Sequence, residues 1–455
     1  MRMSLAPGTS AADSVGGPVP FGEAVAVFAR IGLLSFGGPA GQIALMHRML
    51  VEERKWLDEV RFLHALNYCM LLPGPEAMQL ATYAGWLLHG VRGGLVAGLL
   101  FVLPGAVLIT ALTLVYMLAG ELTIVQGLLF GLKAAVLAVV LEALVKVSKR
   151  ALKSRATVAL AVAAFVAIAF LDMPFPMIIL SAGAIGAALH AAGRSSHASP
   201  GNAVGDSLLV ETAGPEWTRP SLRRFLSTST TWLALWFVPL FALRAVLGPE
   251  NVFSIEAGFF STMAAVTFGG AYAVLAYVAQ QAVEVHQWLR PDEMLTGLGL
   301  AETTPGPLIL VLLFVGALGG ARLSGLDPIV GGLAGALVTL WFTFVPCFLW
   351  IFAGAPYVEK VRNVRWLAAA LSAVTAAVVG VIANLAVWFA LHVLFGEVGE
   401  VAFGPLSLPS PSPSSFDPAA AAIAVAAGVA LLRYHVNLIA VLFVCAVAGA
   451  ALALT

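Results

Sequence analysis

Residues 71–86 read LLPGPEAMQLATYAGW, and two apolar runs meet in this stretch at Pro73-Gly74-Pro75. Proline removes a backbone hydrogen-bond donor and disfavours helix in the residue before it, so no regular helix continues across this tripeptide. A helix can begin again after Pro75, with Glu76 in its first turn. Inside a bilayer, a broken helix is tolerated only where protein or a water-filled cavity satisfies the freed backbone groups. We therefore expect this hinge to lie at a cavity, where a helix N-terminus is available to an anion.

The composition is that of a membrane protein. Of the 455 residues, 60% are hydrophobic and 11% are charged, whereas soluble proteins carry about 25% charged residues. The sequence therefore predicts an all-α polytopic protein in a lipid bilayer. Its formal net charge of zero argues against nucleic acid as a partner. The three cysteines lie far apart in separate apolar runs, which predicts neither a disulfide framework nor a metal site, and no cofactor is expected.

The chain repeats itself. The tripeptide Phe-Gly-Gly at 36–38 recurs at 268–270, Trp-Leu at 56–57 recurs at 288–289, and Pro-Gly-Pro at 73–75 recurs at 305–307, always 232 positions later. Self-similarity at one fixed offset, carried by uncommon residues, indicates an internal duplication. In each half an apolar run ends at Phe-Gly-Gly, a second run follows, the Pro-Gly-Pro hinge comes next, and four longer apolar runs close the half.

This pattern divides the chain into five parts. We expect a disordered N-terminal tail (1–20), a first transmembrane repeat (21–192), a cytoplasmic linker (193–229), a connecting transmembrane helix (230–250) and a second transmembrane repeat (251–455). The Pro- and Ser-rich stretch 404–416 is expected to be a loop. The hinge units are either re-entrant hairpins or irregular full crossings, and the hairpin keeps the basic residues between 48 and 92 on the cytoplasmic side.

The charges of equivalent loops predict the orientation of the two halves. The loop that follows 123–145 contains five basic residues, whereas the equivalent loop after 366–395 contains Glu397 and Glu400 and no Lys or Arg. By the positive-inside rule, the two halves are inverted-topology repeats, and the lone segment 230–247 supplies the odd crossing that inversion needs. Inverted repeats with broken helices are typical of secondary transporters, which hold the substrate near the midplane between the repeats.

The same residues resemble the long-chain chromate transporters of the CHR family. The matching stretches are SFGGPAGQIALMHRM (35–49), LLPGPEAMQLATYAGWLLHG (71–90), GLVAGLLFVLPG (94–105), TFGGAYAVLAYV (267–278), GLAETTPGPLI (299–309) and FVPCFLWIFAGAPYVE (344–359). The resemblance covers nearly the whole chain apart from the N-terminal tail and the linker. It implies a multi-pass protein of the bacterial inner membrane that exports chromate from the cytoplasm, driven by the proton gradient.

Chromate is a tetrahedral divalent oxyanion, so its site needs N–H donors, hydroxyls or fixed positive charges. The candidates for binding are the backbone at Gly37, Gly38, Gly74, Gly269, Gly270 and Gly306, the side chains of Gln42, Gln79, Thr82, Tyr83, Thr303 and Thr304, and the intramembrane cations Arg30 and Lys133. Each has an alternative role. The glycines permit close helix packing, and the polar side chains make helix–helix contacts. Arg30 pairs with an acid such as Glu302, and Lys133 either pairs with an acid or snorkels to the membrane surface.

Glu76 and Glu302 are the candidates for proton coupling. Glu302 lies just before the second hinge, where burial of a carboxylate favours proton binding. Glu76 lies in the first helical turn after the first hinge, where it either stabilises the helix N-terminus or competes with the substrate anion for it. The repeat breaks at both positions, because Leu308 is the counterpart of Glu76 and Met70 that of Glu302. This asymmetry predicts that the halves divide coupling and binding between them.

Three other functions compete with chromate export. The same residues fit sulfate or another oxyanion, uptake in place of export, or a channel. A membrane-embedded enzyme is disfavoured, because the sequence shows no metal-spaced His/Cys/Asp cluster, no nucleotide-binding glycine loop and no nucleophile–base pair. The oligomeric state, including a homodimer, stays open.

Overall fold

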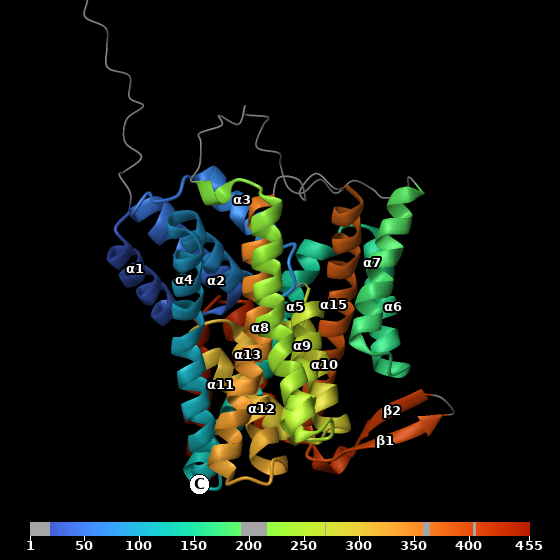
Figure 1. Cartoon of the computed structure of the whole chain (residues 1–455). Helices are drawn as coiled ribbons and strands as arrows, with labels where there is room; N and C mark the ends of the chain where they lie inside the picture. Colours follow the sequence, from blue (N-terminus) through green and yellow to red (C-terminus); the bar gives the residue numbers. More distant parts are fainter. Residues whose placement is uncertain (1–18, 193–215, 269, 358–364, 404–405) are drawn as a thin grey trace, which may run out of the picture.

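The structure is a computed structural model that describes residues 19–192, 216–268, 270–357, 365–403 and 406–455. The described part is a bundle of helices that run mostly along one common direction (Figure 1). Nearly all of the predicted N-terminal tail, most of the predicted linker and the candidate Gly269 lie outside the described residues.

The first half contains seven α-helices and one π-helical turn in its described residues. They are α1 (Phe21–Leu34), α2 (Gly38–His47), the π-helical turn η1 (Arg48–Glu53), α3 (Glu59–Cys69), α4 (Glu76–Ala119), α5 (Thr123–Ala151), α6 (Arg155–Phe170) and α7 (Phe175–Ala191).

After α8 (Leu222–Leu247), the second half follows in a similar order. Its elements are α9 (Val252–Val266), α10 (Ala271–Gln280), the π-helical turn η3 (Gln281–Val285), α11 (Pro291–Thr303), α12 (Val311–Leu323), α13 (Pro328–Gly354), α15 (Arg365–Leu394), α16 (Pro418–Leu432) and α17 (Leu438–Ala453). Even the π-helical turns fall at equivalent places, directly after the second helix of each half.

The segment α4 is two helices joined by a sharp reversal. His89 and Gly90 have non-helical backbone angles, and Gly90 has φ +62°. Gly85 and Gly93 face each other so closely that a Cβ atom on either would overlap the carbonyl oxygen of the other. The stretches before and after Gly90 therefore pack as antiparallel arms. In the second half the corresponding arms are the separate helices α12 and α13, where Gly320 and Gly331 meet in the same way.

Five described segments are long and apolar enough to cross a membrane: Glu76–Ala119, Thr123–Ala151, Leu222–Leu247, Pro328–Tyr357 and Trp366–Leu394. A span needs about 20 residues, so the second arm of α4 is long enough without the first. Six further apolar helices are 10–17 residues long. Short and broken apolar helices beside full-length ones are typical of a membrane protein built around interrupted helices.

The two halves are interleaved. Helix α5 of the first half packs against α16 and α17 of the second, and α15 of the second half packs against α6 and α7 of the first. Small residues permit these close approaches: a Cβ on Gly131 would overlap the carbonyl of Cys445, and one on Gly380 would overlap that of Ala161. The core is therefore shared between the halves.

One boundary and one secondary-structure element differ from the predictions. Helix α8 begins at Leu222, inside the predicted linker, because Leu222, Phe225 and Leu226 follow one another at helical spacing and extend the apolar run. The prediction of an all-α protein also misses a hairpin of β1 (Val398–Phe403) and β2 (Leu406–Pro411), which are antiparallel. Prolines in β2 are compatible with this hairpin because a two-stranded sheet consists only of edges.

Candidate functional site

The two Pro-Gly-Pro hinges bind the opposite halves of the chain. The Gly74 amide donates a hydrogen bond of 2.8 Å to the carbonyl oxygen of Thr267, directly after α9. The Gly306 amide donates one of 2.8 Å to the carbonyl oxygen of Ser35, directly after α1. Ser35 and Thr267 are themselves 232 positions apart. Each hinge thus satisfies the carbonyl of a helix that ends in the interior of the other half.

Only glycine fits at the centre of each hinge. Gly74 has φ +117° and Gly306 has φ +94°, a region that side chains other than glycine avoid. A Cβ on Gly74 would lie 2.9 Å from Gln79 Nε2 and 3.0 Å from Cys347 Sγ. A Cβ on Gly306 would lie 3.1 Å from Leu310 Cδ1 and 3.3 Å from the carbonyl oxygen of Phe101.

One buried glutamine accompanies each hinge. Gln42 Nε2 donates to the Gly306 carbonyl oxygen at 2.6 Å and to that of Ser35 at 3.3 Å. Gln79 Nε2 donates to the Pro73 carbonyl oxygen at 2.7 Å. These bonds orient both amides, because only the nitrogen can donate to a carbonyl. Both Oε1 atoms are buried and have no hydrogen-bond partner within the described residues. A buried acceptor needs a donor, and an O–H group of water or of a singly protonated oxyanion supplies one.

Three helices begin at these interruptions without a side-chain cap. Helix α2 starts after Gly37, α4 after Pro75 and α10 after Gly270, and none of the three N-cap residues supplies a side-chain hydrogen bond. The first N–H groups of a helix have no partner within it and favour negative charge. Gly37 is exposed, whereas Gly38 and Gly270 are partly buried. The arrangement can therefore offer backbone donors to an anion next to the hinges.

Charged residues on one face of α5 act on both candidate carboxylates. The buried Glu302 accepts a hydrogen bond from the Tyr272 hydroxyl, and Glu142 and Lys146 act on it electrostatically. Lys146 Nζ lies 2.6 Å from Glu142 Oε1. Glu76 is partly buried, and the nearby cation that acts on it is Arg150. Because residues 142, 146 and 150 are four apart, they share a face of the helix. Charged residues on one face of α5 therefore influence the carboxylates beside both hinges electrostatically.

The structure does not bring the two predicted intramembrane cations to the hinges. Arg30 is exposed on α1 and does not pair with Glu302. Lys133 Nζ lies 3.2 Å from Asp292 Oδ2, at the start of α11 and away from its hinge end. Lys133 therefore pairs with an acid, which was the expected alternative to anion binding. For Arg30, the position within an apolar run does not specify the direction in which the side chain points.

The threonine candidates bond to the preceding turn of their own segment, and Tyr83 packs among aromatic rings. The Thr82, Thr303 and Thr304 hydroxyls donate to the carbonyls of Met78, Leu300 and Ala301, respectively. Tyr83 is buried, with its ring 5.9 Å from that of Tyr68 and 5.5 Å from that of Trp86. Hydroxyls bonded to the preceding turn satisfy themselves locally, so these residues contribute to packing near the hinges.

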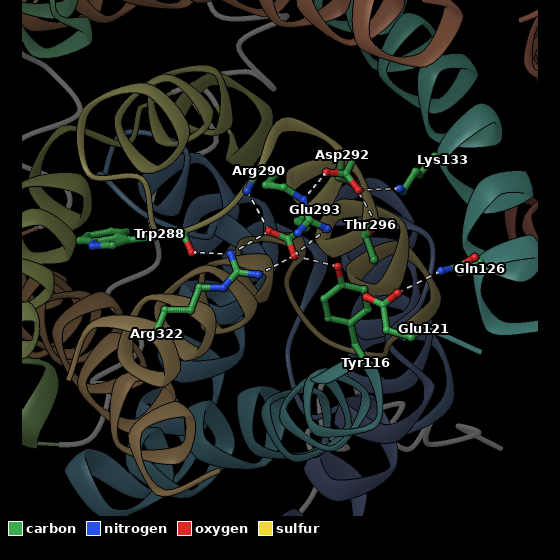
Figure 2. Close-up of polar contacts among 10 residues, drawn as sticks. All are labelled: Tyr116, Glu121, Gln126, Lys133, Trp288, Arg290, Asp292, Glu293, Thr296 and Arg322. Atoms are coloured by element: carbon green, nitrogen blue, oxygen red, sulfur yellow. Dashed lines mark hydrogen bonds and ion pairs between the residues drawn. The ribbon is translucent and has the colours of Figure 1, made fainter. Parts of the chain in front are cut away.

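An ion-pair cluster that was not predicted from the sequence is shown in Figure 2. We name it the Glu293 cluster: Tyr116, Lys133, Arg290, Asp292, Glu293 and Arg322. Glu293 is almost fully buried and accepts two hydrogen bonds from Arg322, at 2.6 and 2.8 Å, and one from the Tyr116 hydroxyl at 2.9 Å. Arg290 lies 3.2 Å from Asp292 and 3.4 Å from Glu293. The cluster lines a cavity of about 890 Å³ between α4, α5, α11 and α12. The signal for it was the dense charge of Arg-Pro-Asp-Glu at 290–293.

Two further functional candidates were also missed. Tyr272, the hydrogen-bond partner of Glu302, lies in the first turn of α10. Glu256 is fully buried in α9, and neither of its oxygens has a hydrogen-bond partner within the described part of the chain. An ionisable residue inside the apolar run 253–268 was the available signal, by the same rule that selected Arg30.

Interrupted apolar helices and buried hinges that join two similar halves are typical of membrane transport proteins. The chromate transporter family model matches residues 22–187 and 257–450, and the chain belongs to this family.

Curated relatives extend over most of the chain. The chromate transport protein of Pseudomonas aeruginosa is 31% identical over 81% of this chain and 81% of its own length. That of Cupriavidus metallidurans is 28% identical over 84% of this chain and 86% of its own length. A probable chromate transport protein of Synechococcus elongatus is 28% identical over 79% and 82%. No solved structure matches the chain.

Proposed function

We propose that this protein is a secondary transporter that exports chromate from the cytoplasm across the bacterial inner membrane, coupled to the proton gradient. The observation that carries the proposal is the reciprocal pair of hydrogen bonds from Gly74 to Thr267 and from Gly306 to Ser35. Because each bond joins a hinge of one half to a helix end of the other, relative movement of the halves changes the site itself. Membership of the chromate transporter family supports the substrate.

The two halves are inserted in opposite orientations. This is supported by the loop charges and by the arrangement in Figure 1, where α2 and α3 lie toward the upper end and α11 and α12 toward the lower end. On this arrangement α3 with the first arm of α4, and α11 with α12, are re-entrant hairpins that enter from opposite sides and carry their hinges to mid-depth. The interleaved packing of α5 and α15 with the opposite halves fits the same plan.

The anion binds at the uncapped starts of α2, α4 and α10, next to the two buried glutamines. Opening toward one side of the membrane breaks the Gly74–Thr267 contact, and opening toward the other breaks the Gly306–Ser35 contact. Since the same backbone groups are available from both sides, one site serves both access states. A singly protonated oxyanion would also donate its O–H to Gln42 Oε1 or Gln79 Oε1, which lack partners among the described residues.

Glu302 carries the coupled proton. It is buried beside the second hinge, and Tyr272 holds one of its oxygens. The face of α5 that bears Glu142, Lys146 and Arg150 leads from Glu302 toward the end of the helix, so it provides charged groups along which the proton can reach the cytoplasmic side. Glu76, beside Arg150, adjusts the potential at the first hinge.

The test is chromate uptake into everted membrane vesicles, with and without an imposed proton gradient, with sulfate as the competitor. We expect gradient-driven chromate accumulation that excess sulfate inhibits weakly. Preferential transport of sulfate would overturn the substrate, and accumulation that ignores the gradient would overturn the coupling. Absence of flux from correctly inserted protein would overturn the transport function.

A further inference from the structure

We propose that Glu256 is a second proton-binding site, and that the proton it carries keeps α9 packed on α12 and so keeps the ion pairs of the Glu293 cluster intact. Any role of Glu256 in transport rests on the proposed function above. The protonation of Glu256 and its effect on the Glu293 cluster do not depend on that function.

The carboxyl group of Glu256 is enclosed by apolar and aromatic groups. Glu256 is 0% exposed, and α9 packs against α8, α12 and α13. On α12 the carboxyl faces Gly319: a Cβ at that position would lie 2.8 Å from Glu256 Oε1 and 3.0 Å from Trp288 Cγ. Glycine at 319 therefore leaves the space that the carboxyl occupies beside the Trp288 ring.

Few charged or titratable groups face this site. On α12, Arg322 lies one turn beyond Gly319 and is bound to Glu293 and to the carbonyl oxygen of Trp288, the latter at 3.0 Å. On α8, the Arg244 guanidinium lies against Gly258, two residues along α9. Helix α13 contains no acidic or basic residue between 328 and 354. In the segment before α11, His286 stacks on Trp288 with ring centres 4.7 Å apart.

An ionised carboxylate in this position is strongly disfavoured, because it is fully buried and neither oxygen has a hydrogen-bond partner among the described residues. Glu256 therefore carries a proton while α9 and α12 are packed as they are here. When the O–H bond breaks, the proton passes to water and a bare carboxylate remains. Arg322, one turn from Gly319, is then drawn from Glu293 toward Glu256.

That exchange of partners would loosen the Glu293 cluster. Arg322 supplies two of the three side-chain hydrogen bonds that Glu293 receives in Figure 2. Without them, Glu293 is a buried charge that contacts only Tyr116 and Arg290 among the side chains of the cluster. The ion pair that holds helix α11 against helix α12 is then lost. Protonation of Glu256 thus favours the intact cluster, and deprotonation favours a loosened cluster with wider access to the cavity.

The first test is infrared spectroscopy of the purified protein at neutral pH. A protonated carboxyl group absorbs in a C=O stretching region separate from that of carboxylates. We expect wild type to show an absorption there that Glu256→Gln removes, also in a Glu302→Gln background, whereas the control Glu121→Gln, which changes an exposed carboxylate, leaves it intact. Identical spectra of wild type and Glu256→Gln in this region would overturn the proposal.

The second test measures access to the cavity without any substrate. Ala321 lines the cavity, so Ala321→Cys can be labelled with a membrane-impermeant thiol reagent in vesicles of each orientation. At each pH, the labelling rate of Ala321→Cys is divided by that of the double variant Ala321→Cys, Glu256→Gln. We expect this ratio to rise several-fold from acid to alkaline pH. A ratio that stays at one would overturn the link to the cluster. Glu256→Met, neutral and of similar size, replaces Glu256→Gln if that variant does not fold. Because neither test uses chromate, both outcomes are independent of the transported substrate.

Discussion

At the first hinge the Gly74 amide donates to Thr267, and at the second the Gly306 amide donates to Ser35, both over 2.8 Å. The side chains around these equal bonds differ. The first hinge has the partly buried Glu76 after it, near Arg150. The second has the buried Glu302 before it, held by Tyr272. The helices before the hinges differ too. Exposed ion pairs lie at the start of α3, whereas the buried Glu293 joins α11 to α12.

The backbone contacts are common to both halves, whereas the ionisable side chains near the hinges are not. The backbone contact recurs because both hinges have to satisfy a helix end of the opposite half, and only glycine fits there. The ionisable groups do not recur, so they are free to serve one half alone. We infer that the hinges share the binding of the anion and that the second half carries the coupling. The predictions below test this division.

The largest effect is expected from Gly74→Ala and Gly306→Ala. Either change forces a side chain into a positive-φ conformation, at a cost of about 1–3 kcal/mol, and places a Cβ against fixed neighbours. We expect both to abolish chromate transport in vesicles. The matched control is Gly325→Ala, with φ +72° and open space around its Cβ, which should retain most transport. Equal loss in all three variants would show that backbone strain alone, and not the hinge, explains the effect.

Glu302→Gln and Glu76→Gln should separate coupling from binding. We expect Glu302→Gln to lose gradient-driven accumulation but to keep chromate exchange down its own gradient, because the anion site is intact and the proton carrier is not. Glu76→Gln should change the apparent affinity for chromate more than the coupling. Both activities are measured in the same vesicles across pH. The division of labour would be contradicted by the two variants behaving alike.

Breaking the Glu293 cluster should destabilise the packing of α4, α11 and α12, which its hydrogen bonds join. Arg322 is 37% exposed and Glu293 is 1% exposed, so Arg322→Ala leaves an almost fully buried carboxylate without its main partner. We expect a loss of about 2 kcal/mol of unfolding free energy, below the value for a fully buried pair. Thermal unfolding in detergent measures it, with Arg48→Ala, which removes an exposed pair with Glu53, as the control. A similar loss in both would mean that the cluster behaves as a surface ion pair.

The smallest effect concerns His47, which joins α2 to α3 beside the first hinge. Its ring nitrogens lie 2.7 Å from Glu59 and 3.1 Å from Glu52. The hydrogen bond with Glu59 raises the pKa of His47 above 6.5, although burial opposes the shift. The protonated ring therefore stabilises the fold fully below pH about 6.5, and this contribution disappears as pH rises through the higher folded-state pKa.

We expect the contribution of His47 to be under about 1 kcal/mol because the site is largely exposed. Unfolding temperatures of wild type and His47→Gln should differ at pH 5 and converge at alkaline pH. A difference that grows with pH would contradict the assigned sign. His47→Gln should leave the hydrogen bond between Gly306 and Ser35 at the second hinge unchanged.

Local chemistry explains what could be predicted. Proline and glycine act on the backbone of their own and adjacent residues, so the hinges at 73–75 and 305–307, the interruptions after α1 and α9, and the duplication could all be identified from the residues. The long helices could be located for the same reason, because an apolar run of about 20 residues is long enough to span a membrane whatever its neighbours are. The β hairpin at 398–411 escaped because its Pro and Ser residues also suit a loop.

The sequence by itself determined a membrane-embedded helical protein with two similar halves, four interrupted helices and carboxylates near the hinges. Only the tertiary structure decided the partners. It joined Gly74 to Thr267 and Gly306 to Ser35, paired Lys133 with Asp292 in place of an anion, and enclosed Glu256 between Gly319 and Trp288. The physical reason is that hydrogen bonds and ion pairs depend on distances of about 3 Å between residues that are often more than 150 positions apart, and those distances exist only once the helices have packed.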